Sequence, residues 1–506
     1  MSCIEEINNY ISETASTWVP ENVLSQFPIR ELQKGLLVSR HFKEITYFTT
    51  PAIANMEKFI AKAVLKRVKK RTIDISLVRD LIHRFELEES KAIGKDFRFA
   101  PEQVEGIITL ASNHFAILTG GPGTGKTSTI KCLVRVLRWL DPYVTIAFTA
   151  PTGKAARRVT ESTGYDASTL QKKIGDTGEE CTRLKTVHED ALITDEVSML
   201  DMPTFYKAIL AVSEQTSWYL IGDIDQLPSV GLGAILRDLI DSGLIPCCQL
   251  QQTFRQDNSS TLFENIQTVK KGGYLPLIEG ADFIRINSED NIERSVLETY
   301  LSKVEEWGLQ QVAILTPYRK QGTICSEKLN QKIKGILNPK GNGNPFIDCI
   351  IIRDDRELFY TFSVGDPVMQ LVNRDECANG DVGTIVEISG KKMVVNYSDQ
   401  EVVYWPDNYN QLDLAYAMSI HKSQGSEYKC VIIPLLGENR NLDRNLIYTG
   451  ITRAKKECIV IGLDDIIQAA CKAQSAWNRI TFLCEEIQIA DCIKDIVSAV
   501  EDDDNQ

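Results

Sequence analysis

The sequence predicts an α/β protein with two parallel-sheet domains, a small inserted β-domain and a helical N-terminal region. From about residue 96, apolar runs typical of buried strands alternate with segments of helical periodicity. This alternation favours parallel sheets covered by helices. Between about 347 and 405, short β-rich segments are separated by turn residues instead. Before residue 96 the apolar spacing is mainly helical.

The N-terminal region, residues 1–95, contains a basic run from Lys66 to Arg71. Both a solvated helix face and a contact with nucleic acid are compatible with such a run. The sequence does not decide between the two, so the role of this region stays open.

Seven apolar runs are candidate buried strands of the parallel sheets. Because they are spread over roughly 350 residues, they suit two sheet domains better than one. The candidate strands are residues 115–119, 145–149, 191–194, 218–221, 312–316, 431–435 and 459–462.

The segment 347–405 contains stretches such as DPVMQLV, GTIVEI and KMVVNY, with Asn-Gly, Ser-Gly and Ser-Asp turns beside them. Short strands joined by such turns are typical of antiparallel hairpins. We therefore expect a small SH3-like barrel inserted into the second sheet domain.

Composition places the chain among ordinary globular proteins. It has 506 residues, 43% of them hydrophobic and 25% charged, and no apolar run approaches the length of a membrane span. The first residues, MSCIEEINNY, do not resemble a secretion signal, so we expect a cytoplasmic protein without a membrane partner. The 13 cysteines are scattered without a C-x-x-C pair, which favours reduced, buried thiols over disulfides or a metal site.

The net charge of −13 argues against a protein that coats nucleic acid. It permits one that grips a few phosphates in a groove, because local charge decides that contact. Part of the negative charge lies in the C-terminal EDDDNQ, which is typical of a solvated tail.

A phosphate-binding loop follows the first candidate strand. Gly120, four further residues, and then Gly125-Lys126-Thr127 complete the pattern between a strand and a helix. A glycine-rich surface turn is the alternative, but the flanking strand and helix argue against it. Backbone N–H groups of such a loop cradle phosphate, Lys126 would neutralise the β- and γ-oxygens, and the Thr127 hydroxyl would reach Mg²⁺. The expected nucleotide-binding residues are Gly121, Pro122, Gly123, Thr124, Gly125, Lys126, Thr127 and Ser128.

Two polar segments follow later strands. Asp195 and Glu196 end the stretch LITDE, where the first carboxylate would hold Mg²⁺ and the second would deprotonate the attacking water. Gln226, in GDIDQLP, is positioned to sense the γ-phosphate. A solvated acidic loop and an Asp-rich turn are the alternatives.

Phosphoryl transfer also needs cations at the transferred group. Arg255 in QQTFRQ and Arg453 in YTGITRAKK stand at suitable points, although a single arginine more often forms a surface ion pair.

Three further loops combine hydroxyls with basic residues, as contacts to a nucleic-acid backbone require. The candidate residues are Thr152, Lys154, Thr316, Arg319, Ser419 and His421.

Together these stretches resemble the RecD-like branch of the superfamily 1 DNA helicases. They occur in the order of that family and span about 100–465. The matching stretches are GGPGTGKT, TAPTGKAA, LITDEVSM, GDIDQLPSVG, TFRQ, ILTPYRKQGT, NGDVGTI, YAMSIHKSQGSE and YTGITRAK.

The resemblance implies two RecA-like motor domains with ATP and Mg²⁺ bound in the cleft between them. Gln103 corresponds to the glutamine that reads adenine, and Gln226, Arg255 and Arg453 to residues that sense the γ-phosphate. The implied domains are a helical region at 1–95; the first motor at 96–265, with a short pin at 172–189; the second motor at 266–346 and 406–470; the barrel at 347–405; and a C-terminal helix with an acidic tail at 471–506.

The activity that the resemblance implies is ATP-driven movement 5′ to 3′ on single-stranded DNA, with unwinding at junctions between single and double strands. Two alternatives stay open at the level of the residues: an RNA helicase, and an ATP-gated scaffold that binds DNA without unwinding it. The protein partners and the pathway are not predicted.

Overall fold

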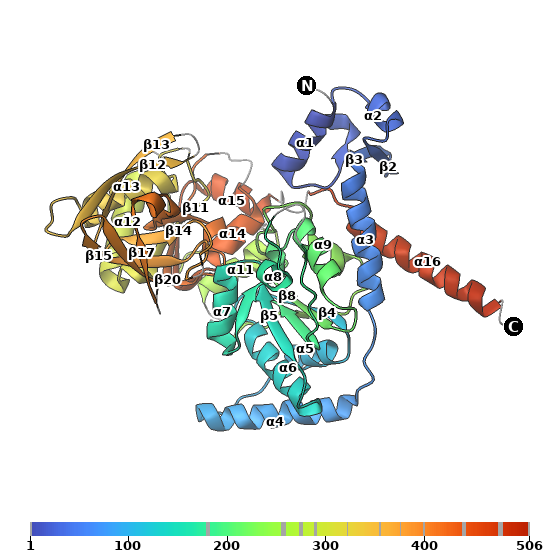
Figure 1. The fold of residues 1–506 in the computed structure, drawn as a ribbon. Helices are drawn as coiled ribbons and strands as arrows, with labels where there is room; N and C mark the ends of the chain where they lie inside the picture. Colours follow the sequence, from blue (N-terminus) through green and yellow to red (C-terminus); the bar gives the residue numbers. More distant parts are fainter. Residues whose placement is uncertain are drawn as a thin grey trace. The chain divides into compact units, whose positions relative to one another are not determined.

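The computed structural model describes residues 3–178, 183–254, 260–272, 277–287, 291–320, 322–353, 356–374, 376–397, 400–437, 442–473 and 479–503. The chain forms two compact units (Figure 1). The first comprises residues 1–151, 159–254 and 476–506, and the second comprises residues 152–158 and 255–475.

The N-terminal region of the first unit combines helices with a small antiparallel sheet, which the sequence did not predict. The order in that sheet is β1-β3-β2. Ile7, Ile11 and Phe48 form its buried core. The elements are α1 (Cys3–Thr14), β1 (Val19–Pro20), α2 (Ile29–Gln33), β2 (Val38–Phe42), β3 (Ile45–Thr49), α3 (Pro51–Arg67) and α4 (Ile75–Ile93).

A six-stranded parallel sheet forms the centre of the first unit, in the order β6-β5-β7-β8-β4-β9. In β4, Phe115 and Ile117 pack on one side of the sheet, whereas Ala116 and Leu118 pack on the other. This alternation shows that both faces are buried, as the apolar runs predicted. The strands are β4 (Phe115–Gly120), β5 (Ile146–Ala150), β6 (Ala167–Thr169), β7 (Ala191–Thr194), β8 (Ser217–Gly222) and β9 (Cys247–Leu250).

Helices cover the two faces of this sheet. Residues of α4, α5 and α6 pack on one face, and residues of α3, α9, α10 and α16 pack on the other. The further helices of this unit are α5 (Pro101–Ala111), α6 (Lys126–Leu140), α7 (Gly153–Thr163), which begins in the residues assigned to the second unit, α8 (Leu170–Ile174), α9 (Met202–Ala211), α10 (Ile235–Asp241) and α16 (Leu483–Asp503).

The segment expected to form a pin, residues 172–189, begins in α8 and continues after Gly175 without a named strand in its described part. Gly175 has a φ of 68° and ends that helix. Residues 179–182 of this segment lie outside the described residues. The pin therefore stays a prediction.

The C-terminal segment returns to the first unit, where α16 packs against α3 (Figure 1). Next to this contact, the Glu57 carboxylate of α3 is buried and accepts hydrogen bonds from three donors. These are the Thr17 hydroxyl at 2.6 Å, the Trp18 indole N–H at 2.8 Å and the Phe482 N–H at 3.2 Å. Burial raises the pKa of Glu57 to about 7, and the three donors act in the opposite direction. One carboxylate thus joins the two ends of the chain.

The second unit contains a five-stranded parallel sheet in the order β10-β21-β20-β11-β19. Together with the first sheet it confirms the predicted α/β class with two parallel sheets. The elements are α11 (Thr261–Lys270), β10 (Phe283–Ile286), α12 (Ile292–Trp307), β11 (Val312–Thr316), α13 (Ser326–Leu337), β19 (Ala417–Ser419), β20 (Tyr428–Pro434), α14 (Arg444–Ile451), β21 (Ala454–Ile461) and α15 (Asp464–Lys472).

An antiparallel sheet lies between β11 and β19 in the chain, with the order β17-β16-β15-β14-β18, and a separate hairpin pairs β12 with β13. The outer strands, β17 and β18, are not paired with each other in this order, so closure into a barrel stays a prediction. The strands are β12 (Phe346–Arg353), β13 (Arg356–Ser363), β14 (Pro367–Gln370), β15 (Val382–Ser389), β16 (Lys392–Tyr397), β17 (Gln400–Tyr404) and β18 (Leu412–Leu414).

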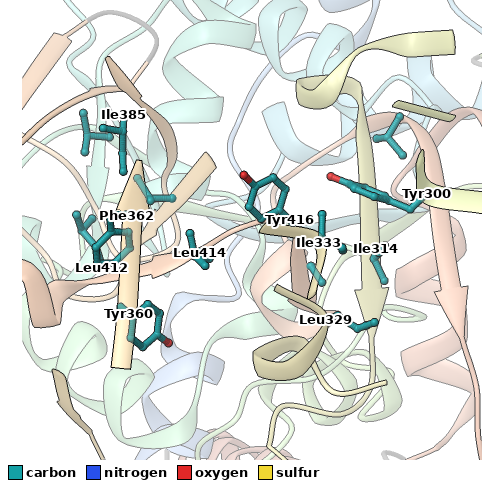
Figure 2. Close-up of a cluster of buried hydrophobic side chains, with 14 of the residues drawn as sticks. Tyr300, Ile314, Leu329, Ile333, Tyr360, Phe362, Ile385, Leu412, Leu414 and Tyr416 are labelled. Atoms are coloured by element: carbon teal, nitrogen blue, oxygen red, sulfur yellow. The ribbon is translucent and has the colours of Figure 1, made fainter. Parts of the chain in front are cut away.

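A single hydrophobic cluster joins the antiparallel and parallel sheets of the second unit. Figure 2 shows Leu412 and Leu414 of the antiparallel sheet in one cluster with Ile314 of the parallel sheet and Tyr300 of α12. Tyr416 belongs to the same cluster, and its hydroxyl donates to Asp366 at 2.7 Å. The inserted strands therefore share a core with the sheet that carries them. Among the described residues, no helix is long and apolar enough to cross a membrane.

The buried Glu57 carboxylate yields a stability prediction. Glu57→Gln places an amide N–H₂ among donors, and we expect it to lower the free energy of unfolding by about 1–3 kcal/mol. Thermal melting of the purified variant measures this loss. Glu13→Gln, on the exposed side of α1, is the matched control and should melt like the parent chain. Equal melting of both variants would contradict a structural role for Glu57.

Candidate nucleotide-binding site and nucleic-acid loops

The loop between β4 and α6 has the backbone that a phosphate cradle requires. Gly123 and Gly125 have φ values of 76° and 81°, a region that glycine enters at little cost. A Cβ on Gly125 would also lie 2.1 Å from the Gln103 Nε2 atom. Because α6 begins at Lys126, its N-terminal N–H groups and the positive end of its dipole lie at the end of this loop.

The Lys126 ammonium lies within this loop. It donates to the Gly121 carbonyl at 3.0 Å and also to the Gly120 carbonyl. The Thr124 hydroxyl also donates to the Gly121 carbonyl, at 2.8 Å, which closes the turn of the loop. The loop is thus preformed, with its cation inside.

Gln103 is buried, and both ends of its side chain are engaged. Its Oε1 accepts from the Ala100 N–H at 2.9 Å, which caps the start of α5. Its Nε2 donates to the Thr124 carbonyl at 3.0 Å. Gln103 therefore connects α5 to the phosphate loop, and adenine reading stays a prediction.

Asp195 and Glu196 follow β7, the strand next to β8. Asp195 Oδ1 accepts from the Glu196 N–H at 2.8 Å. Glu196 itself has a φ of 54°, in the left-handed region that non-glycine residues rarely adopt. Such strain is concentrated at functional sites, where the surrounding structure holds it. Both carboxyl side chains are partly exposed and accessible to a ligand.

Gln226 follows β8 and is held by Asp223. The Gln226 amide donates to Asp223 Oδ2 at 3.0 Å, and both side chains are buried. Asp223 Oδ1 also accepts from the Asp225 N–H at 3.1 Å, which closes the turn. The orientation of Gln226 is thus set by a carboxylate three residues before it.

The strand order brings these segments to one edge of the sheet. β7, β8 and β4 are consecutive neighbours, and parallel strands end at the same edge. Asp195, Gln226 and Lys126 follow these three strands in turn. A cation, a hydroxyl at Thr127 and a carboxylate at Asp195 fit a nucleotide with Mg²⁺, which is bound by few protein ligands and by phosphate oxygens. The described residues contain no group of three or more His, Cys, Asp or Glu that could hold a metal alone.

The segment after β9 is attached to the same site. The Phe254 N–H donates to the Gly123 carbonyl at 2.8 Å. Glu102 accepts from the N–H groups of Gln251 at 2.9 Å and Gln252 at 2.6 Å. Arg255, expected to contact the γ-phosphate, lies outside the described residues.

Arg453, the other expected arginine, is buried within the second unit. Its guanidinium donates to the Thr449 carbonyl at 3.1 Å and to the Ser426 carbonyl at 3.3 Å. These bonds fix its position between α14 and the loop before β20. Its expected role in catalysis stays a prediction.

Two loops of the second unit carry expected nucleic-acid contacts. Arg319 and His421 are exposed and Ser419 is partly exposed, whereas Thr316 is fully buried. The Thr316 hydroxyl donates to the Ile324 carbonyl at 2.9 Å and accepts from the Tyr318 N–H at 3.2 Å. Thr316 thus shapes the loop that carries Arg319.

Thr152 and Lys154 follow β5, the next strand of the first sheet. The Thr152 hydroxyl accepts from the Ala155 N–H at 3.2 Å. The Lys154 ammonium is enclosed, and burial lowers its pKa to about 8 while Asp381 acts in the opposite direction. A contact between Lys154 and a phosphate would therefore require the ammonium to become exposed.

Sequence reasoning missed two residues that support the site. Asp223 orients Gln226. The sequence did indicate this residue, because it is an acidic residue that directly follows a buried strand. Glu102 holds the segment after β9, and nothing in the sequence indicated it, since its partners are about 150 residues away in the chain.

Two family models match the chain. A model described as an AAA domain matches residues 103–232, and a UvrD-like helicase C-terminal domain matches residues 414–461. The first includes the phosphate loop and Gln226. The second includes the His421 loop and Arg453.

Known proteins are similar to most of this chain. The ATP-dependent RecD2 DNA helicase of Deinococcus radiodurans is 32% identical over an alignment of 394 positions, which covers 76% of this chain and 52% of that protein. The RecBCD enzyme subunit RecD of Mycolicibacterium smegmatis is 28% identical over an alignment of 431 positions, which covers 76% of this chain and 74% of that protein. The chain thus spans about half the length of the first relative. A solved structure of two coordinating Pif1 helicases has a TM-score of 0.49 at 17% identity, over 75% of this chain and 96% of that one.

The phosphate loop yields the first prediction about activity. Lys126→Ala should abolish ATP hydrolysis with the fold retained, because the side chain contacts only its own loop carbonyls in the described hydrogen bonds. Turnover and thermal melting measure the two properties. Lys131→Ala, five residues further along α6, is the control and should retain turnover. Normal turnover in Lys126→Ala would refute the assignment of this loop.

Glu196, with its strained backbone, yields the second prediction about activity. Glu196→Gln should bind ATP but hydrolyse it at least about a hundredfold more slowly, because the amide keeps the shape and cannot accept the proton. Binding of labelled ATP and steady-state turnover separate the two effects. Glu161→Gln, on the exposed side of α7, controls for loss of charge. A Glu196→Gln chain that cannot bind nucleotide would instead make Glu196 a structural or metal residue.

Proposed function

We propose that the chain is a RecD-like helicase of superfamily 1, an ATP-driven motor that moves 5′ to 3′ on single-stranded DNA and unwinds duplex DNA; its similarity to RecD2 and RecD proteins and the two matching family models support this. The observation that carries the proposal is the convergence of Lys126, Asp195 and Gln226 at one edge of the first sheet. The relative named as an ATP-dependent RecD2 DNA helicase favours DNA over RNA as the substrate.

Hydrolysis is assigned to residues of this edge. Lys126 binds the β- and γ-phosphate oxygens, while Thr127 and Asp195 hold Mg²⁺, which when bound neutralises charge on those oxygens. Glu196 accepts the proton of the attacking water. The strained backbone of Glu196 supports this role, because strain of about 1 kcal/mol or more is concentrated at functional sites.

Sensing of the γ-phosphate is assigned to Gln226, Arg255 and Arg453. The bond between Gln226 and Asp223 supports this, since a preoriented amide loses little entropy when it contacts phosphate. Arg255 and Arg453 would supply positive charge to the transferred group.

The grip on DNA is assigned to Thr152, Lys154, Thr316, Arg319, Ser419 and His421. The exposed side chains of Arg319 and His421 support direct contact with phosphates. Thr316 acts through the shape of its loop. A grip built from so few basic residues is compatible with a net charge of −13, because local charge decides the contact.

The direction of movement yields a further prediction. With Mg²⁺ and ATP, the chain should unwind a duplex that carries a 5′ single-stranded tail and leave the matched 3′-tailed duplex intact. Release of the labelled strand on a native gel measures the unwinding of each duplex. The Lys126→Ala chain is the control and should unwind neither duplex.

Unwinding from the 3′ tail alone would contradict the proposed direction while leaving the ATPase assignment intact. Unwinding of neither duplex, with ATP turnover still stimulated by DNA, would limit the activity to translocation.

A further inference from the structure

The loop that follows Gln226 is held by a side chain from the far end of the chain. Residues 227–233 connect Gln226 to α10, and Leu227 and Ser229 are buried within this loop. Its carbonyl groups lie outside any named helix or strand, so they need other partners.

Arg479 supplies hydrogen-bond donors for three of these carbonyl groups. Its guanidinium donates to the Ser229 carbonyl at 2.6 Å and to the Gly233 carbonyl at 2.9 Å, with longer contacts to the Gly231 carbonyl at 3.3 Å and the Ser229 hydroxyl at 3.4 Å. Because the planar guanidinium contacts three carbonyls of one loop, it fixes the curvature of that loop. The ammonium of a lysine is a point charge and does not impose such a geometry.

The residues after Arg479 are anchored in turn, so Arg479 is held firmly. The Ile480 N–H donates to the Ser16 hydroxyl at 3.0 Å, and the Thr481 hydroxyl donates to Asp238 of α10 at 3.0 Å. The Phe482 N–H donates to the buried Glu57. The Phe482 ring packs edge-on against Trp18.

The 227–233 loop is also connected to the N-terminal region and to the segment that follows Asp195 and Glu196. The Gly233 N–H donates to the Ala15 carbonyl at 2.9 Å, and Leu232 packs against the N-terminal core. The Met202 N–H donates to the Leu232 carbonyl at 2.8 Å, and Met202 begins α9 shortly after Asp195 and Glu196. The 227–233 loop thus lies between both chain ends and the candidate catalytic edge.

We propose that Arg479 is a positioning residue for ATP hydrolysis, which keeps the 227–233 loop, and through it Gln226, in the arrangement that the reaction requires. This inference rests on the proposed function. Without Arg479, the three carbonyls form hydrogen bonds with water instead, and the loop samples other conformations. Nucleotide affinity is set mainly by the phosphate loop on β4, so it is retained, whereas the rate of the chemical step falls.

The test compares Arg479→Ala and Arg479→Lys with Arg40→Ala in the full-length chain. Arg40 donates to Glu486 at 2.8 Å and lies over the Phe482 ring, so its loss loosens the same C-terminal segment and leaves the bonds of Arg479 in place. The measurements are kcat and KM for ATP with single-stranded DNA, the Kd of a non-hydrolysable ATP analogue, thermal melting, and hydrogen exchange of the 227–233 amides.

We expect Arg479→Ala to lower kcat by on the order of tenfold, with the analogue Kd changed by less than about threefold. The kcat of Arg479→Lys should lie between those of Arg479→Ala and the parent chain. Arg40→Ala should keep kcat within about twofold of the parent value. Amide exchange at 227–233 should increase in Arg479→Ala and stay unchanged in Arg40→Ala.

An Arg479→Ala chain with the kcat and exchange of the Arg40→Ala control would overturn the proposal. If Arg479→Ala does not fold, Arg479→Lys decides: a lower kcat at unchanged melting supports the positioning role, and an unchanged kcat refutes it. A parent chain without ATP turnover would refute the proposed function instead. The exchange comparison would then still test whether Arg479 holds the loop.

Discussion

The common edge of the six-stranded sheet is the constraint on which the candidate site depends. β7, β8 and β4 are parallel neighbours, so the segments that follow them meet without any further device. The buried strands fix the positions of these segments, and local bonds then fix their directions. Gly123 and Gly125 shape one loop, Glu196 adopts a left-handed backbone after β7, and Asp223 orients Gln226.

The sequence predicted the long apolar strands and the motifs that follow them, because both depend on neighbours in the chain. The run 115–119 corresponds to β4, 191–194 to β7 and 312–316 to β11. It missed the three-residue strands β6 and β19 and the N-terminal sheet, whose short segments lack a clear apolar period. It also missed Glu102 and Arg479, since bonds between residues 150 to 250 positions apart leave no local pattern.

The two ends of the chain acquire a role from this arrangement. Sequence alone left residues 1–95 unexplained and described the C-terminus as a helix with an acidic tail. In the first unit both ends meet at Glu57, and both contact the 227–233 loop, through Ala15 and Arg479. The terminal regions are therefore part of the structure that holds the 227–233 loop, which directly follows Gln226 in the chain.

In the proposed function, ATP hydrolysis at the sheet edge is coupled to the binding of single-stranded DNA. The most direct test is ATP turnover by the purified full-length chain with no nucleic acid, with single-stranded DNA and with RNA of the same sequence. We expect slow turnover without nucleic acid, at least several-fold faster turnover with single-stranded DNA, and a smaller increase with RNA. Turnover that is the same in all three conditions would contradict the coupling, even if the nucleotide site itself is active.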